Sequence, residues 1–159
     1  MPVIGHCLGG QLMARALGAR INESPAPEIG WQPLQVLDNP EAVHWLGAPG
    51  ERVVFQWHHE AFELPAGATS LATSGACAHQ AFALGPHIAM QFHVEVDLDK
   101  LTRWSQETGE RWERVLNERT VQTGVAMREA ARRHLAAQQR LADRIYGHWL
   151  GWIDAQTGE

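Results

Sequence analysis

The apolar positions of the first 97 residues fall into short runs and alternations that are typical of β-strands. Residues 2–6 form an apolar run that predicts a short buried strand, and residues 52–58, rich in β-branched and aromatic side chains, predict a second one. Further short strands are expected at 34–38, 70–74, 79–84 and 88–96. The proline-rich stretch 22–33 predicts a loop.

Apolar spacings of three and four residues indicate helices elsewhere in the chain. A first helix is predicted directly after the opening strand, with Gly18 as its stop. Residues 98–120 have helical spacing that is broken near Gly109, and residues 123–153 carry the longest helical pattern. The chain is therefore expected to close with helices.

The length of the chain fits one domain. With 159 residues, of which 45% are hydrophobic and 19% charged, the chain can bury one core and is too short for two comfortable domains. A strand–helix opening, further strands and a helical close predict an α/β sheet covered by helices, with an α/β part at 1–97 and a helical tail at 98–159. In this tail Trp149 and Trp152 either pack within the chain or face a partner.

The net charge argues against nucleic acid as a partner. The formal charge is −5, and the first 100 residues carry ten acidic and four basic side chains. Since a phosphate-binding face needs clustered Lys and Arg, we expect no nucleic-acid partner. No apolar run approaches the roughly 18–20 residues of a membrane span, and the N-terminus lacks the pattern of a secretory signal. We therefore expect no membrane insertion either.

The two cysteines, Cys7 and Cys77, are too few for a disulfide framework in a chain of this size. They predict free thiols in a reducing compartment, so we expect a cytoplasmic protein. Cys77 has no special context and is expected to be an ordinary buried thiol. Cys7, in contrast, lies in a distinctive sequence context.

Cys7 lies where the opening strand turns sharply into the first helix, in the stretch "VIGHCLGGQ". Gly5 and Gly9 flank it two positions away on either side, which permits a crowded backbone and a positive φ. The unpaired N–H groups at the helix start favour a thiolate, and the N–H of Leu8 is a natural donor to a developing oxyanion. These features predict a nucleophile. The alternative is a buried cysteine that acts as a small hydrophobic residue.

A nucleophilic thiol needs a histidine within reach that is oriented by a third group. Among the nine histidines, His93 has the most informative context, at the end of a predicted strand in "MQFHVEVD". Glu95 follows two residues later, and residues i and i+2 of an extended segment face the same way. The sequence therefore predicts a catalytic set of Cys7, His93 and Glu95.

The stretch "WHHEAF" raises the alternative of a metal site, which would be formed by His58, His59 and Glu60 together with His79 and His87. Adjacent side chains on a strand point to opposite faces, so they rarely bind one ion. We interpret the cluster as structural or cleft-lining and expect no metal.

Two ordered motifs resemble those of class I (triad) glutamine amidotransferases. Residues 5–11, Gly-His-Cys-Leu-Gly-Gly-Gln, resemble the G-x-C-x-G-x-Q nucleophile elbow, and "QFHVEV", about 86 residues later, resembles the closing Q-F-H-x-E motif with Val94 where many members have Pro. Within the family, "EIGW", "FQWHHEAFELPAGA" and "AFALGPHIAMQFHVE" resemble free-standing glutaminase-like proteins related to the amidotransferase domain of GMP synthase. The resemblance covers about residues 2–97. His59 departs from it, because the resembling proteins often read His-Gly-Asp at this position.

The resemblance implies a fold and a reaction. The fold is a flavodoxin-like open sheet with flanking helices, incomplete at the N-terminus, followed by a helical C-terminal segment. In the reaction the Cys7 thiolate attacks the side-chain amide of glutamine, His93 transfers the proton, and Glu95 orients His93. The same triad would also suit a γ-glutamyl amide or peptide hydrolase, and a binding or regulatory module without turnover is the alternative from another class.

The resemblance also implies the binding residues and partners. Gln11 and Gly9 are expected to contact the substrate, with the Leu8 N–H as oxyanion donor. The expected partner is glutamine or a γ-glutamyl substrate; a synthetase subunit or self-association stays open. No cofactor is expected.

Finally, the resemblance implies roughly 80 further residues before the elbow, built as strand–helix–strand units with a Gly-rich loop that carries a second oxyanion donor. Three explanations are open: a fragment or misassigned start, strands supplied by another polypeptide, or a non-catalytic remnant. The two intact motifs favour the first. Because losing one oxyanion donor costs about 10²–10³ in rate, the isolated chain is expected to show little glutaminase activity and to associate.

Overall fold

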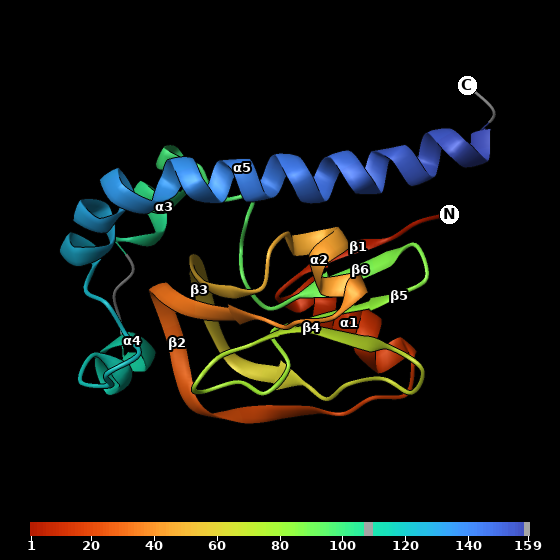
Figure 1. Cartoon of the computed structure of the whole chain (residues 1–159). Coiled ribbons are helices and arrows are strands. Elements are labelled where there is room, and N and C mark those ends of the chain that lie inside the picture. Colours follow the sequence, from red (N-terminus) through yellow and green to blue (C-terminus); the bar gives the residue numbers. More distant parts are fainter. Residues whose placement is uncertain (107–109, 158–159) are drawn as a thin grey trace.

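The computed structural model describes residues 1–106 and 110–157, which form a mixed α/β domain (Figure 1). The strands are β1 (Ile4–His6), β2 (Ile21–Val36), β3 (Gly50–Phe62), β4 (Thr69–Thr73), β5 (Ala81–Leu84) and β6 (His87–Met90). The helices are α1 (Leu8–Ala16), α2 (Pro40–Leu46), α3 (Leu98–Trp104), α4 (Glu110–Val115) and α5 (Gly124–Thr157).

The strands of the described residues form one sheet in the order β1-β6-β5-β4-β2-β3. β1 runs parallel to β6, with Ile4 opposite Ile88, and the remaining pairs are antiparallel. Helices lie on both faces of this sheet, and α5 runs the length of the domain above α2 (Figure 1). The predicted α/β sheet with flanking helices and a helical C-terminal segment is confirmed.

The loop predicted at 22–33 is wrong, because these residues belong to the long strand β2, which pairs with β3 over most of its length. Proline cannot donate a ladder hydrogen bond and is tolerated in strands at bulges and edges. Pro25 and Pro27 fall where the register of the two strands shifts, between Glu23 and Glu28. The prolines therefore mark an irregularity inside the strand rather than its absence.

The strand predicted at 88–96 ends at Met90, and residues 91–96 form bends and turns. The apolar run continues past the strand because Phe92, Val94 and Val96 are buried in the core without being part of the sheet. One helix, α2, was not predicted; Asn39 caps it by accepting a hydrogen bond from Ala42 N at 2.9 Å.

Each face of the sheet has its own core. β6 shows the division, since Ile88 and Met90 face a cluster under α2 and α5, whereas Ala89 faces a cluster under α1. The first cluster includes Leu34, Val36, Trp45, Leu46, Val54, Leu71, Phe92, Leu141 and Ile145, and the second Ala14, Phe62 and Phe82. A third cluster, with Trp31, Phe55, Leu101 and Met127, lies under α3 and the start of α5.

The helical tail packs on the α/β part. Trp149 lies against the core beneath α5, whereas Trp152 is 42% exposed. The break predicted at Gly109 lies outside the described residues. In the part of the chain that the structure describes, none of the helices combines the length and the apolar character needed to cross a membrane.

Candidate functional site

Cys7 occupies a sharp bend between β1 and α1. Its φ of 43° is positive, a strained conformation for a residue with a side chain. The bend is held by a hydrogen bond from Cys7 N to Met90 O of 2.8 Å. It also needs Gly5, because a Cβ there would lie 2.7 Å from the backbone of Gly9 and Gly10. The predicted elbow is thus formed, and its strain is local to the cysteine.

His93 and Glu95 form a close pair after the end of β6. His93 Nδ1 lies 2.7 Å from Glu95 Oε1, and Lys100 Nζ lies 3.0 Å from the same oxygen. The ring of Trp104 meets the imidazole edge to face at 4.9 Å. The predicted pairing of His93 and Glu95 is therefore present, although these residues lie in a turn and not in a strand.

The outer edge of β3 brings the two parts of the site together. Phe55 and Trp57 direct their carbonyls away from β2, and His93 N donates to Phe55 O at 2.9 Å. Two residues further along the same edge, the Cys7 thiol donates to Trp57 O at 3.6 Å. Because β1 and β3 are at opposite ends of the strand order, the sheet must curl to make this contact. In this structure the hydrogen bond of Cys7 Sγ goes to Trp57, not to His93.

Gln11 extends from α1 to the same edge. It is 7% exposed, and its Nε2 donates to Glu60 O at 3.0 Å. Gln91 Nε2 donates to this carbonyl at 2.6 Å, and His58 Nδ1 lies 3.2 Å from it. Three side chains therefore contact the Glu60 carbonyl oxygen, and this contact fixes the position of Gln11.

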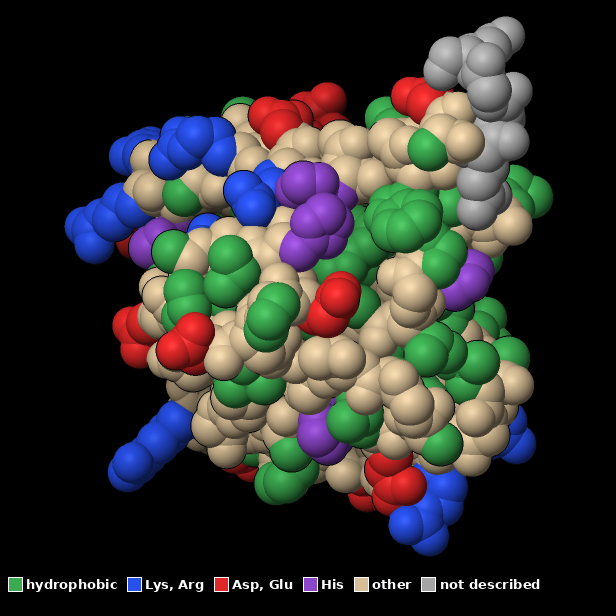
Figure 2. Space-filling model, turned by 45° about the vertical axis from the view of Figure 1, so that its right-hand side comes forward, with side chains coloured by type: hydrophobic (Ala, Val, Ile, Leu, Met, Phe, Trp, Pro, Cys, Tyr) green, Lys and Arg blue, Asp and Glu red, His purple; other side chains and the backbone are tan. Residues whose placement is uncertain are grey.

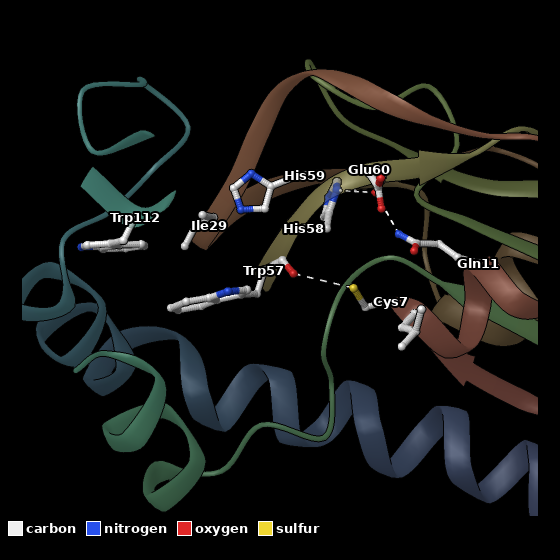
Figure 3. Close-up of a pocket in the computed structure, with 9 residues that line it drawn as sticks. Cys7, Gln11, Ile29, Trp57, His58, His59, Glu60 and Trp112 are labelled. Atoms are coloured by element: carbon white, nitrogen blue, oxygen red, sulfur yellow. Dashed lines mark hydrogen bonds between the residues drawn. The ribbon is translucent and has the colours of Figure 1, made fainter. Parts of the chain in front are cut away.

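A cavity of about 340 Å³ opens beside the elbow (Figure 3). Its wall consists of Cys7, Leu8, Gln11, Ile29, Trp57, His58, His59, Glu60 and Trp112. The rings of Trp57 and Trp112 are stacked with an interplanar angle of 10° and centroids 5.6 Å apart. Thus Cys7 and Gln11, two predicted site residues, share one cavity. His93 is 8% exposed and is not part of this wall.

The family model of the class-I glutamine amidotransferases matches residues 1–104. The chain belongs to this family.

This chain is 38% identical over 114 residues to the glutamine amidotransferase-like protein YfeJ of Salmonella typhimurium, a match that covers 66% of this chain and 46% of the relative. It is 34% identical over 113 residues to a GMP synthase of Aeropyrum pernix, covering 70% of this chain and 21% of that protein. A glutamine-hydrolysing GMP synthase subunit of Thermoplasma acidophilum is 33% identical over 99 residues, covering 60% of this chain and 48% of that protein. The chain thus spans less than half the length of these curated relatives.

Two solved structures resemble this domain. A glutamine amidotransferase from Methylobacillus flagellatus superposes with a TM-score of 0.85 at 34% identity, covering 94% of this chain and 62% of that one. A second, from Thermotoga maritima, superposes with a TM-score of 0.76 at 28% identity, covering 92% and 61%. They confirm the family and the fold class inferred from the two motifs.

The electrostatics around Cys7 differ from one expectation based on the sequence. Burial raises the pKa of the Cys7 thiol; the Leu8 N–H acts in the opposite direction, and the charges of Glu95 and Glu60 raise the pKa further. The helix start therefore favours the thiolate as expected, but burial outweighs it. The resting thiol is protonated, in agreement with its donation to Trp57 O. Burial likewise raises the pKa of Cys77 to about 11, as fits an inert buried thiol.

Glu95 keeps its charge despite its burial. Burial raises its pKa, but the hydrogen bond and charge of His93 and the charge of His6 together lower it to about 2. His6, the residue before Cys7, has Nε2 3.8 Å from Glu95 Oε2. Its pKa is lowered, mainly by burial and against the pull of Glu95. The carboxylate is thus shared between two imidazoles.

Leu8 and Gly9 follow Cys7 in the first turn of α1. The Leu8 N–H is directed at the Cys7 sulfur, and its side chain is exposed. A Cβ at Gly9 would meet nothing within 4 Å, so this position faces open space. There is thus room in front of the first turn.

A second His–Glu pair was missed by sequence reasoning. His58 Nε2 lies 3.2 Å from Glu28 Oε2, and both side chains are almost completely buried. Gln80 Nε2 donates to the same carboxylate and Gln56 Nε2 to Gln80 Oε1. Glu28 was expected in a loop, so no strand register linked it to His58. Residues 1–106 and 110–157 contain no cluster of His, Cys, Asp and Glu suited to a metal ion.

Proposed function

We propose that this domain hydrolyses the side-chain amide of glutamine through a thioester on Cys7. The observation that supports the proposal best is that Cys7, in its strained elbow, and His93, paired with Glu95, are held by carbonyls two residues apart on β3. Successive carbonyls on one side of a strand are about 7 Å apart. The proposal requires that a rotation of the Cys7 side chain exchange Trp57 O for the imidazole of His93.

The reaction proceeds in two halves. His93 takes the thiol proton, and the sulfur attacks the amide carbon, whose oxygen becomes an oxyanion facing the Leu8 N–H. The C–N bond then breaks, His93 returns the proton, and ammonia leaves. In the second half His93 activates a water that cleaves the thioester, which yields glutamate and restores the thiol. Glu95 stabilises the imidazolium that forms in each half.

Gln11 and Glu60 would bind the amino-acid end of the substrate. Since Gln11 Nε2 is engaged with Glu60 O, its Oε1 is free to accept a hydrogen bond from the substrate. The Glu60 side chain lies in the cavity wall and offers a carboxylate for an α-ammonium group. Gly9, with open space before it, would let the substrate approach the helix start.

A γ-glutamyl amide or peptide is the second candidate substrate. The stacked Trp57 and Trp112 form an aromatic wall of the cavity that a bare amide group would not need. An amine substituent on the γ-glutamyl group could pack against these rings. The same triad would then release an amine in place of ammonia.

A synthetase is a candidate partner that would consume the ammonia. The likeness to the glutamine-hydrolysing GMP synthase subunit of Thermoplasma acidophilum supports this pairing. By analogy, we propose a glutaminase domain that works with a separate synthetase in the cytoplasm, where its free thiols Cys7 and Cys77 stay reduced.

Labelling with a glutamine-derived diazoketone, followed by peptide mass mapping, tests the proposal. We expect the label on Cys7 in the wild type and in Cys77→Ser, and none in Cys7→Ser. Ammonia and amine release from glutamine and several γ-glutamyl amides then identifies the substrate. Labelling with slow turnover fits the proposal and the expected loss of one oxyanion donor, labelling with no turnover at all would indicate a binding module, and an unlabelled Cys7 in folded protein would contradict the proposal.

A further inference from the structure

A second pair of cavities lies far from the elbow in the sequence, where α5 crosses α2 and the start of β3. One, of about 310 Å³, is lined by Leu46, Gly47, Ala48, Arg52, Ala137, Arg140, Leu141 and Arg144. The other, of about 250 Å³, is lined by Glu51, Arg52, Val53, His134, Ala137, Gln138 and Leu141. They share Arg52, Ala137 and Leu141 and are therefore neighbours; together we call them the α5 hollow.

The charge around the α5 hollow is positive although the chain as a whole is negative. Arg52, Arg140 and Arg144 line it, and the one carboxylate in its described wall is Glu51. Among the described residues, no Asp or Glu is within ion-pair distance of these three arginines. On the face drawn in Figure 2, Lys and Arg side chains gather along the long upper helix, and histidines lie beside them in the seam below it.

Two of the arginines are held by backbone carbonyls alone. Arg144 donates from Nε and Nη2 to the carbonyls of Val43 and His44 at the end of α2, at 2.9–3.2 Å. Arg52 Nη2 donates to Ala48 O at 3.1 Å. These contacts fix both guanidinium groups but leave their charges uncompensated by any anion.

Two buried donors in the wall of the α5 hollow have no partner. They are Arg52 Nε and Gln138 Nε2. Gln138 is 1% exposed, and its other terminal atom, Oε1, accepts from Phe55 N at 2.7 Å. A buried donor without a partner is costly. Both orphan groups are donors, so an acceptor bound in the hollow that reached them would complete their hydrogen bonding.

The neighbouring arginines oppose each other. Burial, and secondly the charge of Arg144, lowers the pKa of Arg52. Gly47 permits this crowding, because a Cβ at this residue would lie 3.0 Å from Arg52 Nη2. Like charges held this close are stabilised by an anion placed between them.

We propose that the α5 hollow binds a small ligand through a phosphate group. A phosphate offers several acceptor oxygens, and guanidinium groups bind it through paired hydrogen bonds. Arg52, Arg140 and Gln138 would donate to these oxygens, and Arg144 would add charge. The hollow has room for more than a bare phosphate, so the phosphate is either free or attached to an organic group.

Titration of the full 159-residue chain with inorganic phosphate, and separately with a nucleoside monophosphate, tests the proposal by calorimetry at constant ionic strength. We expect saturable binding with Kd of about 1 mM or tighter. Arg140→Gln and Arg52→Gln should each weaken it about tenfold, since each removes a charge-assisted hydrogen bond. In ¹H–¹⁵N spectra the side-chain amide of Gln138 should shift along the same binding curve.

Arg132→Gln is the matched control, because it removes the same charge from an exposed position on α5 outside the hollow. It should bind like the wild type. Tighter binding of the nucleotide would indicate a phosphorylated organic ligand, and equal binding would indicate free phosphate. Absence of saturable binding, or an equal loss in Arg132→Gln, would overturn the proposal and leave a hollow filled by water. None of these outcomes depends on catalysis at Cys7.

Discussion

Tyr146, on the last helix, lies with its hydroxyl 3.2 Å from Nε2 of His6, the residue that precedes the cysteine at the elbow. The two residues are 140 positions apart in the sequence. His6 is in turn 3.8 Å from Glu95. The helical tail is therefore linked, through one intervening imidazole, to the carboxylate that pairs with His93.

Tyr146→Phe tests this link. The substitution keeps the ring and removes one partly buried hydrogen bond, so we expect the free energy of unfolding to fall by about 0.5–1.5 kcal/mol. Urea denaturation measures the change. A variant as stable as the wild type would show that the Tyr146–His6 bond contributes nothing to the docking of α5.

Glu95→Gln should alter the response to acid. In the folded protein the pKa of Glu95 is lowered to about 2, below the value of about 4.3 in an unfolded chain. The charged carboxylate therefore stabilises the fold above about pH 4.3, and this stabilisation is lost as the pH falls towards 2. Wild type and variant should differ by roughly 2 kcal/mol at pH 7 and converge at low pH. A difference that stays constant with pH would contradict this.

The two cysteines should react differently with iodoacetamide, which attacks thiolates. Because burial raises the pKa of Cys7, its alkylation in the native protein should be slow at pH 7 and still increase above pH 9. Cys77, with its pKa raised to about 11, should stay unmodified until the protein unfolds. Mass mapping after timed exposure gives both rates. Rapid alkylation of Cys7 that levels off below pH 8 would instead indicate a resting thiolate.

Gly124→Ala should destabilise the packing of α5 on α3. A Cβ at Gly124 would lie 1.8 Å from the backbone oxygen of Ser105, so one helix must move, at a cost of about 1–3 kcal/mol. Gly147→Ala is the control on the same helix, since a Cβ there meets nothing within 4 Å. It should be neutral or stabilise by about 0.5–1 kcal/mol. Thermal unfolding of both variants gives the comparison, and equal effects would refute the close approach.

Leu12→Glu should reduce self-association. Val3, Leu8 and Leu12 are 44%, 65% and 59% exposed, and they lie beside β1, which among the described strands pairs with β6 alone. An apolar patch at an open sheet edge promotes association. Sedimentation velocity should therefore show concentration-dependent oligomers of the wild type and fewer of the variant. Leu150→Glu, at an apolar residue 50% exposed on α5, should leave the association unchanged.

The parts of the site that depend on neighbours in sequence could be predicted. Gly5, Cys7 and Gly9 form one tight turn, and His93 and Glu95 are two residues apart, so local geometry alone brings each group together. The triad motifs could thus be located before any fold was known. Their mutual approach depends on the curl of the sheet, which no local pattern encodes.

The parts that depend on long-range register could not be predicted. Because of Pro25 and Pro27, the first half of β2 was predicted as a loop. The pairing that buries Glu28 beside His58 was therefore missed as well. Likewise, nothing near Gln138 in the sequence indicates that it satisfies the edge of β3 at Phe55. Helix periodicity predicted α5 but not which polar side chain would turn inward.

Strand β3 supports Cys7 and Gln11 through carbonyl oxygens, those of Trp57 and Glu60. A main-chain acceptor survives any change of its own side chain. The side chains at 57 and 60 can therefore drift during evolution, or be redesigned, while the nucleophile and the glutamine stay in register. If the proposed reaction holds, substrate choice and chemistry are separable in this domain, and the stacked Trp57 and Trp112 are the place to change specificity.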